Sequence, residues 1–240
     1  MKSLLSPAVA ERLTHIQEHQ EQYTPNERVA EMLGQKSLVM LIGPCAVGKS
    51  YLIDQLVTLN PEFRKSRSFT TRPPRPDDTP DTIRYLQWTD ESISTFCDDI
   101  EAGEFVNFTF HPKTGEIYGT ALQDHPGTYN LMPTLASSVE PLEALPFQQA
   151  PIIGLVTTPT QWQQWFNKRE FTSSTDRAAR IGEGISSLAW LLTEPRASIV
   201  ANTLDADAAT TIQEIVATAV IDRDEETTEQ LRDYLESQLR

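Results

Sequence analysis

One short segment constrains what this chain can fold into more than any other, because it matches a phosphate-binding loop. Residues 43–50 read GPCAVGKS, and the positions that fit the pattern G-x-x-x-x-G-K-[ST] are Gly43, Gly48, Lys49 and Ser50. The apolar run at residues 38–42 predicts a buried strand before the loop, and the residues after it predict a helix. In that setting backbone N–H groups and the positive end of the helix converge on phosphate oxygens. The segment therefore predicts a nucleotide-phosphate site in which Lys49 contacts the phosphates and Ser50 holds Mg²⁺.

The remainder of the chain alternates between strand-like and helical patterns. Short apolar runs at residues 129–132, 152–156 and 198–201 are typical of buried parallel strands. Residues 104–111 alternate like a strand, and residues 112–115 have the composition of a hairpin turn. Helices are predicted over residues 91–102, 135–144, 159–167, 177–192, 206–220 and 225–240. Strands that alternate with helices indicate an α/β layered fold with a mainly parallel sheet.

The first 35 residues are predicted to form two helices ahead of this pattern. Apolar residues recur at helical spacing between positions 5 and 16. A second helix is predicted to begin with Thr24 as N-cap, Pro25 at its first position and Glu27 closing a capping box. Docking of this segment on the core is the expected arrangement, with docking on a partner as the alternative.

The charge balance limits the partners that this chain can have. Acidic residues number 34 against 20 basic ones, a net charge of −14, which argues against a nucleic-acid surface. The chain lacks an apolar run of about 18 residues, so we expect no membrane span. The N-terminal apolar stretch ends at Glu11 and Arg12, so we expect no signal peptide. We predict a cytoplasmic protein that acts on a small molecule, and its oligomeric state stays open.

A second group of residues that can bind an anion follows the loop. Residues 66–76 read SRSFTTRPPRP, which places Arg72 and Arg75 three residues apart in a stretch stiffened by proline. Two guanidinium groups held in this way can clamp one phosphate through paired hydrogen bonds. Because the stretch follows a phosphate loop in a very acidic chain, we interpret it as an anion clamp. The acidic run that comes next, at residues 77–81, is predicted to be solvated.

Together these motifs resemble the guanylate kinases, which transfer the γ-phosphate of ATP to GMP. The resemblance rests on GPxxxGKS and SxTTRPPRP, and it continues in one order through YGT at residues 118–120, PIIGLVTTP at 151–159 and SIVANTLDAD at 198–207. It implies a P-loop NTPase three-layer fold with a small acceptor-binding subdomain and a lid. The implied division is a helical extension (1–35), a guanylate kinase-like domain (36–222, with the subdomain at about 66–120 and the lid at about 165–182) and a C-terminal helix (223–240).

The same resemblance implies ATP and Mg²⁺ as cofactors and assigns a role to each matching residue. The residues implied in ATP binding are Gly43, Ala46, Val47, Gly48, Lys49, Ser50, Tyr51 and, near adenine, Asn202. Those implied in stabilising the transferring phosphoryl group are Lys49, Arg169 and Arg180. Those implied in gripping the acceptor phosphate are Arg72, Arg75, Tyr85 and Tyr118. Those implied on the guanine side are Ser68, Asn107 and Thr120.

Departures from the family gather on the side that reads the base. Asn107 stands where the family has a glutamate on the guanine edge, and Met132 and Thr134 stand where it has two aspartates. Trp165 replaces a lid arginine. A carboxylate accepts from both N1–H and N2–H₂ of guanine, whereas an amide offers one acceptor. Loss of such a charged hydrogen bond costs about 1.5–3 kcal/mol, roughly one to two powers of ten in guanine preference.

Three functions remain open on these residues. The first is an ATP-dependent nucleoside monophosphate kinase, with GMP or a related monophosphate as the acceptor. The second is a kinase for a non-guanine phosphorylated acceptor such as ribose 1,5-bisphosphate, although enzymes of that kind do not carry the TTRPPRP clamp. The third is a guanylate kinase-like binding module without turnover, as in membrane-associated scaffold homologues, whose phosphate loops are usually degraded. The intact loop and the clamp favour the first.

Overall fold

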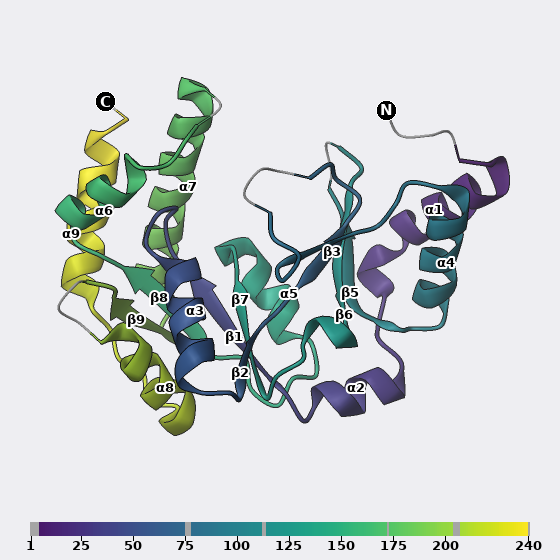
Figure 1. Ribbon diagram of the computed structural model, residues 1–240, viewed down its shortest axis with the longest axis horizontal. Helices are drawn as coiled ribbons and strands as arrows, with labels where there is room; N and C mark the ends of the chain where they lie inside the picture. Colours follow the sequence, from purple (N-terminus) through teal and green to yellow (C-terminus); the bar gives the residue numbers. More distant parts are fainter. Residues whose placement is uncertain (1–4, 75–77, 112–113, 172, 204–206, 240) are drawn as a thin grey trace. The chain divides into compact units, whose positions relative to one another are not determined.

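The computed structural model describes residues 5–74, 78–111, 114–171, 173–203 and 207–239. The chain divides into two compact units. Figure 1 shows the chain with its colours following the sequence. Unit 1 comprises Met1–Ser37, Arg64–Asn130 and Leu145–Gln148. Unit 2 comprises Leu38–Phe63, Leu131–Ala144 and Gln149–Arg240. The phosphate loop belongs to unit 2 and the arginine stretch to unit 1.

A five-stranded sheet carries the phosphate loop. Its strand order is β2-β7-β1-β8-β9, and the β1–β8 and β8–β9 pairs are parallel. The strands are β1 (Ser37–Ile42), β2 (Phe63–Lys65), β7 (Tyr129–Pro133), β8 (Ile152–Val156) and β9 (Ala197–Ala201). Every residue of β1 and β8 is buried, which explains why their sequences are continuous apolar runs. The predicted α/β fold with a mainly parallel sheet is confirmed.

Helices of unit 2 pack in pairs beside these strands. The helices are α3 (Lys49–Leu59), α5 (Val139–Glu143), α6 (Pro159–Phe166), α7 (Ser174–Thr193), α8 (Ala208–Thr218) and α9 (Glu225–Ser237). Figure 1 shows α3 beside α8, and α7 beside α9. Gly154 of β8 lets α7 approach closely, since a Cβ at this glycine would lie 2.7 Å from the Leu191 side chain. Among the described helices, even the 20-residue α7 lacks the continuous apolar stretch that crossing a lipid bilayer requires.

The C-terminal helix α9 is built into unit 2. Its apolar side buries Leu231 and Leu235. Just before it, the Arg223 guanidinium donates hydrogen bonds to the carbonyls of Glu194 at 2.7 Å and Ala197 at 2.9 Å. A cation is favourable there because the carbonyls at the end of α7 carry partial negative charge. The charged tail therefore fixes the end of α7.

Unit 1 is built on a smaller, four-stranded sheet. Its order is β4-β3-β6-β5, with β3–β4 parallel and the β3–β6 and β5–β6 pairs antiparallel. The strands are β3 (Ser68–Thr70), β4 (Ile83–Tyr85), β5 (Phe105–Phe110) and β6 (Ile117–Ala121), and α4 (Asp90–Glu101) covers them. Phe69, Phe96 and Phe105 meet at ring-centroid distances of 4.8–5.9 Å. This aromatic core fixes the sheet that carries the predicted acceptor residues.

Helix α1 (Pro7–Glu18) docks on α4 within unit 1. Leu13 and Ile16 join the aromatic core of the sheet. The Arg12 guanidinium forms ion pairs with Asp98 at 2.7 Å and Glu101 at 2.9 Å. The N-terminal segment therefore extends the core of unit 1.

Helix α2 (Glu27–Leu33) begins later than its sequence predicts. The N-cap is Asn26, whose side chain accepts from the Val29 amide at 2.9 Å, so the predicted capping box at Thr24 is wrong. The reason is tertiary. The Asn26 amide donates to the Gly103 carbonyl at 2.9 Å, and its side chain donates to the Ala102 carbonyl at 3.0 Å. These bonds to the end of α4 hold Asn26 in the extended conformation of an N-cap.

A buried histidine makes the stability of unit 1 depend on pH. His125 is 1% exposed, and its Nδ1 lies 3.3 Å from the Ser66 hydroxyl. Burial lowers the pKa of His125 to about 4, against about 6.5 in an unfolded chain. Between these values the unfolded state takes up a proton that the folded state does not. The free energy of unfolding should therefore fall by up to about 3 kcal/mol as the pH drops from about 6.5 to 4.

Urea unfolding at several pH values between 7 and 4 checks this expectation. A His125→Gln variant should lose less stability than the wild type across the window, because its side chain cannot be protonated. His15→Gln removes an exposed histidine and should keep the wild-type slope. Equal slopes in all three proteins would contradict the role given to His125.

Candidate functional site

The phosphate loop in unit 2 needs glycine at two positions. Gly48 has φ = 90°, a left-handed conformation that side chains rarely adopt. A Cβ there would also lie 2.2 Å from the Asn202 side-chain nitrogen. At Gly43, a Cβ would lie 2.3 Å from the Leu155 carbonyl oxygen of β8. The backbone can therefore adopt this tight turn before α3 only because both residues are glycine.

Lys49 is held over the loop by backbone oxygens. Its Nζ donates to the Gly43 carbonyl at 2.5 Å and to the Pro44 carbonyl at 2.8 Å. Burial lowers the pKa of Lys49 to about 8. An ammonium group so poorly solvated gains more from an anionic partner than one in water does. The next residue, Ser50, is exposed at the start of α3 and offers a hydroxyl oxygen.

That hydroxyl suits the Mg²⁺ that the resemblance implies. Mg²⁺ prefers oxygen ligands and usually keeps several waters, so it is commonly bound through one or two protein oxygens plus substrate phosphates. Ser50 can supply one such oxygen next to the loop that would hold the phosphates. The residues present therefore fit the metal.

A pocket of about 780 Å³ opens beside the loop in unit 2. Its lining residues are Ala46, Gly48, Tyr51, Leu52, Gln55, Trp165, Arg169, Asn202, Thr203 and Asp207. Five of these belong to the residues that the sequence assigned to ATP binding or transfer. Asn202 is 5% exposed, and its side-chain nitrogen donates to the Val47 carbonyl at 2.8 Å. The volume is in the range of small-molecule sites.

The lid arginines lie in different surroundings. Arg169 lines the pocket. Arg180 is an exposed residue of α7, where it donates to Glu183 at 3.2 Å and lies 3.7 Å from Asp176. The structure therefore brings Arg169 to the pocket, whereas Arg180 is held by acidic neighbours on its own helix.

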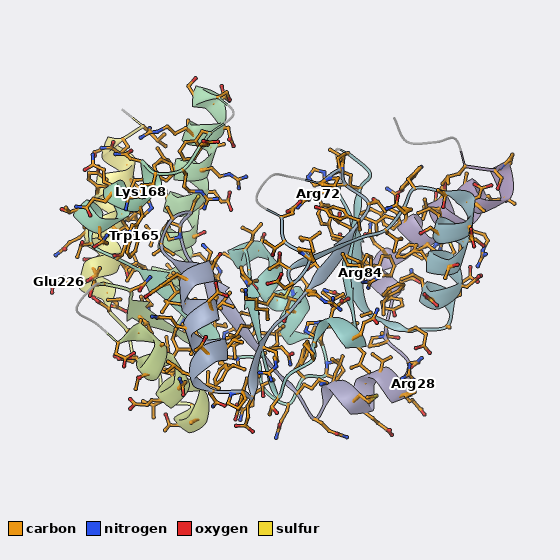
Figure 2. All side chains as sticks on the ribbon, in the orientation of Figure 1. Arg28, Arg72, Arg84, Trp165, Lys168 and Glu226 are labelled. Carbon is orange, nitrogen blue, oxygen red and sulfur yellow. The ribbon has the colours of Figure 1, made fainter. Side chains whose placement is uncertain are left out.

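Two tryptophans of α6 contribute in ways that the sequence did not identify. Trp165, labelled in Figure 2, forms part of the pocket wall where the family has a lid arginine. Trp162 is buried, and its Nε1 donates to the Cys45 carbonyl at 2.8 Å. This bond attaches α6 to the phosphate loop. Only the apolar spacing of α6 could have indicated it, and that pattern does not distinguish a core residue from a loop anchor.

In unit 1 the predicted acceptor clamp is already engaged with carboxylates. Arg72, labelled in Figure 2, is 7% exposed and forms a two-pronged ion pair with Asp78, with both N···O distances 2.6 Å. The Tyr85 hydroxyl donates to the same carboxylate. The Tyr118 hydroxyl donates to Glu116 at 3.2 Å. Arg75 lies outside the described residues.

The Asp78 contact corrects one expectation from the sequence. The acidic run after the arginines was expected to be solvated, yet the Asp78 side chain is only 12% exposed. The hydrogen bond to Asp78 raises the pKa of Arg72, so this guanidinium stays charged. A buried arginine requires a partner, and Asp78, six residues along the chain, supplies it.

The predicted base side lies on neighbouring strands of unit 1. Asn107 of β5 is directly opposite Thr120 of β6 in the sheet register. The Thr120 hydroxyl donates to the Asn107 side-chain oxygen at 2.8 Å. That bond uses one of the two acceptor positions of the amide oxygen, and the amide nitrogen can only donate. Ser68, the third residue of this group, begins β3 in the same sheet.

Where the family has a pair of aspartates, unit 2 carries neutral residues. The Thr134 hydroxyl donates to the Met132 carbonyl at 3.0 Å, and its amide donates to the Leu41 carbonyl at 2.9 Å. Thr134 therefore uses its hydroxyl and its amide in hydrogen bonds to backbone carbonyls of this chain. Neither position can supply a carboxylate to a metal or an acceptor.

Comparison with known proteins gives short matches to one family. No protein-family model matches the chain. The guanylate kinase of Synechococcus sp. (strain JA-3-3Ab) is 40% identical over 83 residues, which are 35% of this chain and 36% of that protein. The guanylate kinase of Thermobifida fusca (strain YX) is 38% identical over 85 residues, which are 35% of this chain and 40% of that protein. The chain thus spans about two fifths of the length of the curated relatives it matches.

Among solved structures, the crystal structure of guanylate kinase from Anaplasma phagocytophilum covers 85% of this chain and 95% of its own, with a TM-score of 0.48 and 15% identity. These sequence matches agree with the resemblance to guanylate kinases that the motifs carry. Over about a third of its length, this chain is similar in sequence to guanylate kinases.

Proposed function

We propose that this protein transfers the γ-phosphate of ATP to a nucleoside monophosphate, with GMP as acceptor and with weakened selectivity for guanine. The observation that carries the proposal is the phosphate loop of unit 2, in which Lys49 is poised at the loop carbonyls beside a pocket of about 780 Å³. Sequence similarity to guanylate kinases supports the choice of acceptor.

The chain's own residues account for most of what phosphoryl transfer demands. Lys49 and Arg169 stabilise the charge that spreads over the transferring group, because catalysis of this reaction is mainly positioning and electrostatics. Asn202 fixes the wall of the pocket through the Val47 carbonyl. Ser50 would hold Mg²⁺, which would supply positive charge to offset that of the phosphates. Arg72 and Tyr85 bind the acceptor phosphate.

The uncharged Asn107 on the predicted guanine side leads to a prediction about selectivity between bases. Replacing Asn107 by Glu restores two acceptor oxygens on the edge that meets guanine N1–H and N2–H₂, and Thr120 can satisfy only part of that carboxylate. We expect Asn107→Glu to raise kcat/KM for GMP relative to AMP or IMP by about tenfold or more. The measurement is kcat/KM for each monophosphate in both proteins.

A matched control separates charge from length. Asn107→Gln has the same length as the glutamate variant but keeps the amide, so its preference should stay near that of the wild type. A wild type that already prefers GMP by several powers of ten would show that another residue reads the base.

One assay tests the proposed function against its competitors. The protein is incubated with Mg²⁺ and ATP labelled in the γ-phosphate, together with GMP, AMP, IMP or ribose 1,5-bisphosphate. Label in GDP supports the proposal. Label in the bisphosphate product alone identifies a sugar-phosphate kinase, and ATP binding without any labelled acceptor identifies a binding module.

A further inference from the structure

Each described residue of the predicted phosphate clamp points its donor at a carboxylate of this chain. The Arg72 guanidinium donates to both oxygens of Asp78, and it also donates to the Pro73 carbonyl at 2.9 Å. Tyr85 donates its hydroxyl proton to the same carboxylate. Tyr118 donates to Glu116. These are the groups that the sequence assigned to the acceptor phosphate.

A carboxylate and a phosphate compete for such donors. The fork of a guanidinium binds either anion through two parallel N–H···O bonds, so it cannot give the same pair of bonds to both. Solvent screens the contact poorly, since the Arg72 and Asp78 side chains are 7% and 12% exposed. A phosphate dianion that approached Arg72 with Asp78 in place would therefore meet repulsion between like charges.

We propose that Asp78 is an internal competitor that occupies the acceptor-phosphate position on Arg72 and Tyr85 and thereby sets the affinity for the acceptor. The inference rests on the proposed function for the identity of the competing ligand. The acceptor binds when its phosphate displaces the Asp78 carboxylate from the two donors. Asp78 thus lowers acceptor affinity and keeps the buried guanidinium paired while no acceptor is present.

A different role for Asp78 predicts the opposite result. If the carboxylate only orients Arg72 toward the phosphate, removing its charge disorders the guanidinium and weakens acceptor binding. If the carboxylate competes, removing its charge strengthens binding. The sign of the change in affinity therefore decides between the two roles.

Calorimetric titration of the full chain with GMP, and separately with inorganic phosphate, supplies that sign. Asp78→Asn keeps the shape of the side chain and one oxygen for Arg72 but removes the negative charge. We expect Asp78→Asn to lower the Kd for GMP at least tenfold and to strengthen phosphate binding in the same direction. Asp81→Asn is the matched control, because Asp81 carries the same charge nearby, is exposed and pairs with Lys65 at 3.3 Å. Its Kd should stay within about twofold of the wild type.

An unchanged or raised Kd for GMP in Asp78→Asn overturns the proposal, as does a variant that binds neither ligand. Thermal unfolding shows whether Asp78→Asn is folded. If it is not, Asp78→Ser takes its place, and the same changes in Kd support or overturn the proposal. Turnover separates this inference from the proposed function. If Asp78→Asn binds GMP more tightly but neither protein transfers phosphate, Asp78 is a competitor and the proposed kinase activity is wrong. If the wild type transfers phosphate but Asp78→Asn does not bind GMP more tightly, the kinase activity stands and the competitor role is wrong.

Discussion

Replacing Lys49 by alanine is expected to lower the rate of phosphate transfer by about a thousandfold. Removing one preorganised donor from developing charge costs about 10²–10³ in kcat, and Lys49 carries a full charge at the phosphates. Stability should change little. The side chain is half-buried and its Nζ donates to the loop carbonyls of Gly43 and Pro44, so its loss opens no cavity in the apolar core. Single-turnover rates with ATP and GMP measure the loss.

Lys36→Ala is the control for this variant. Lys36 is also half-buried, and it also donates to a backbone carbonyl, that of Gly127 at 3.4 Å. It lies outside the proposed machinery, so turnover should stay close to that of the wild type. Unchanged turnover and ATP affinity in Lys49→Ala would overturn the assignment of the phosphate loop.

Arg72→Ala is expected to raise the KM for the acceptor by roughly ten- to a hundredfold and to leave ATP affinity nearly unchanged. A charge-assisted pair with a phosphate contributes about 1.5–3 kcal/mol, which corresponds to that factor. The separation of effects follows from the fold, since Arg72 belongs to unit 1 and the ATP loop to unit 2. The measurement is KM for GMP and for ATP in the same protein, with steady-state kinetics.

Arg72→Lys sharpens this test. Lysine keeps the positive charge but cannot offer the two-pronged fork, so its KM for GMP should fall between those of the wild type and the alanine variant. The alanine variant also leaves the mostly buried Asp78 carboxylate without its cation, so the thermal stability of this variant should be measured alongside. Equal losses for ATP and acceptor would show that Arg72 is structural.

Features with a local cause could be predicted from the sequence. The strands β1 and β8 are buried over their whole length, and such strands must be continuous apolar runs. The phosphate loop was also recognisable, because Gly48 needs a left-handed backbone and Gly43 faces the Leu155 carbonyl, conditions that only glycine meets. In each case the residue type and the local geometry determine one another.

Features whose cause lies far along the chain were missed. The start of α2 is set by bonds from Asn26 to the end of α4, some 76 residues away, which no local capping pattern records. The attachment of α6 to the loop depends on Trp162, whose apolar spacing indicates burial but not its bond to Cys45.

The partner of Arg72 shows the same limit at short range. An acidic run beside a proline-rich stretch is ordinarily solvated, and only the fold of unit 1 reveals that Asp78 is drawn onto the guanidinium. The sequence likewise shows that residue 107 is asparagine and not an acid, but it does not show where the Asn107 amide points. The register of β5 and β6 places Thr120 opposite it, and this pairing leaves the amide nitrogen facing away from that bond as a donor.

The most direct test of the account follows one phosphoryl group through a single turnover. The protein, in excess over γ-labelled ATP, is mixed with Mg²⁺ and saturating GMP, and ADP and labelled GDP are quantified over time. We predict that the two products appear in equal amounts and at the same rate, and that Lys49→Ala slows the formation of both by about a thousandfold. ADP that forms without labelled GDP, or ATP that stays intact while bound, would contradict phosphate transfer to GMP.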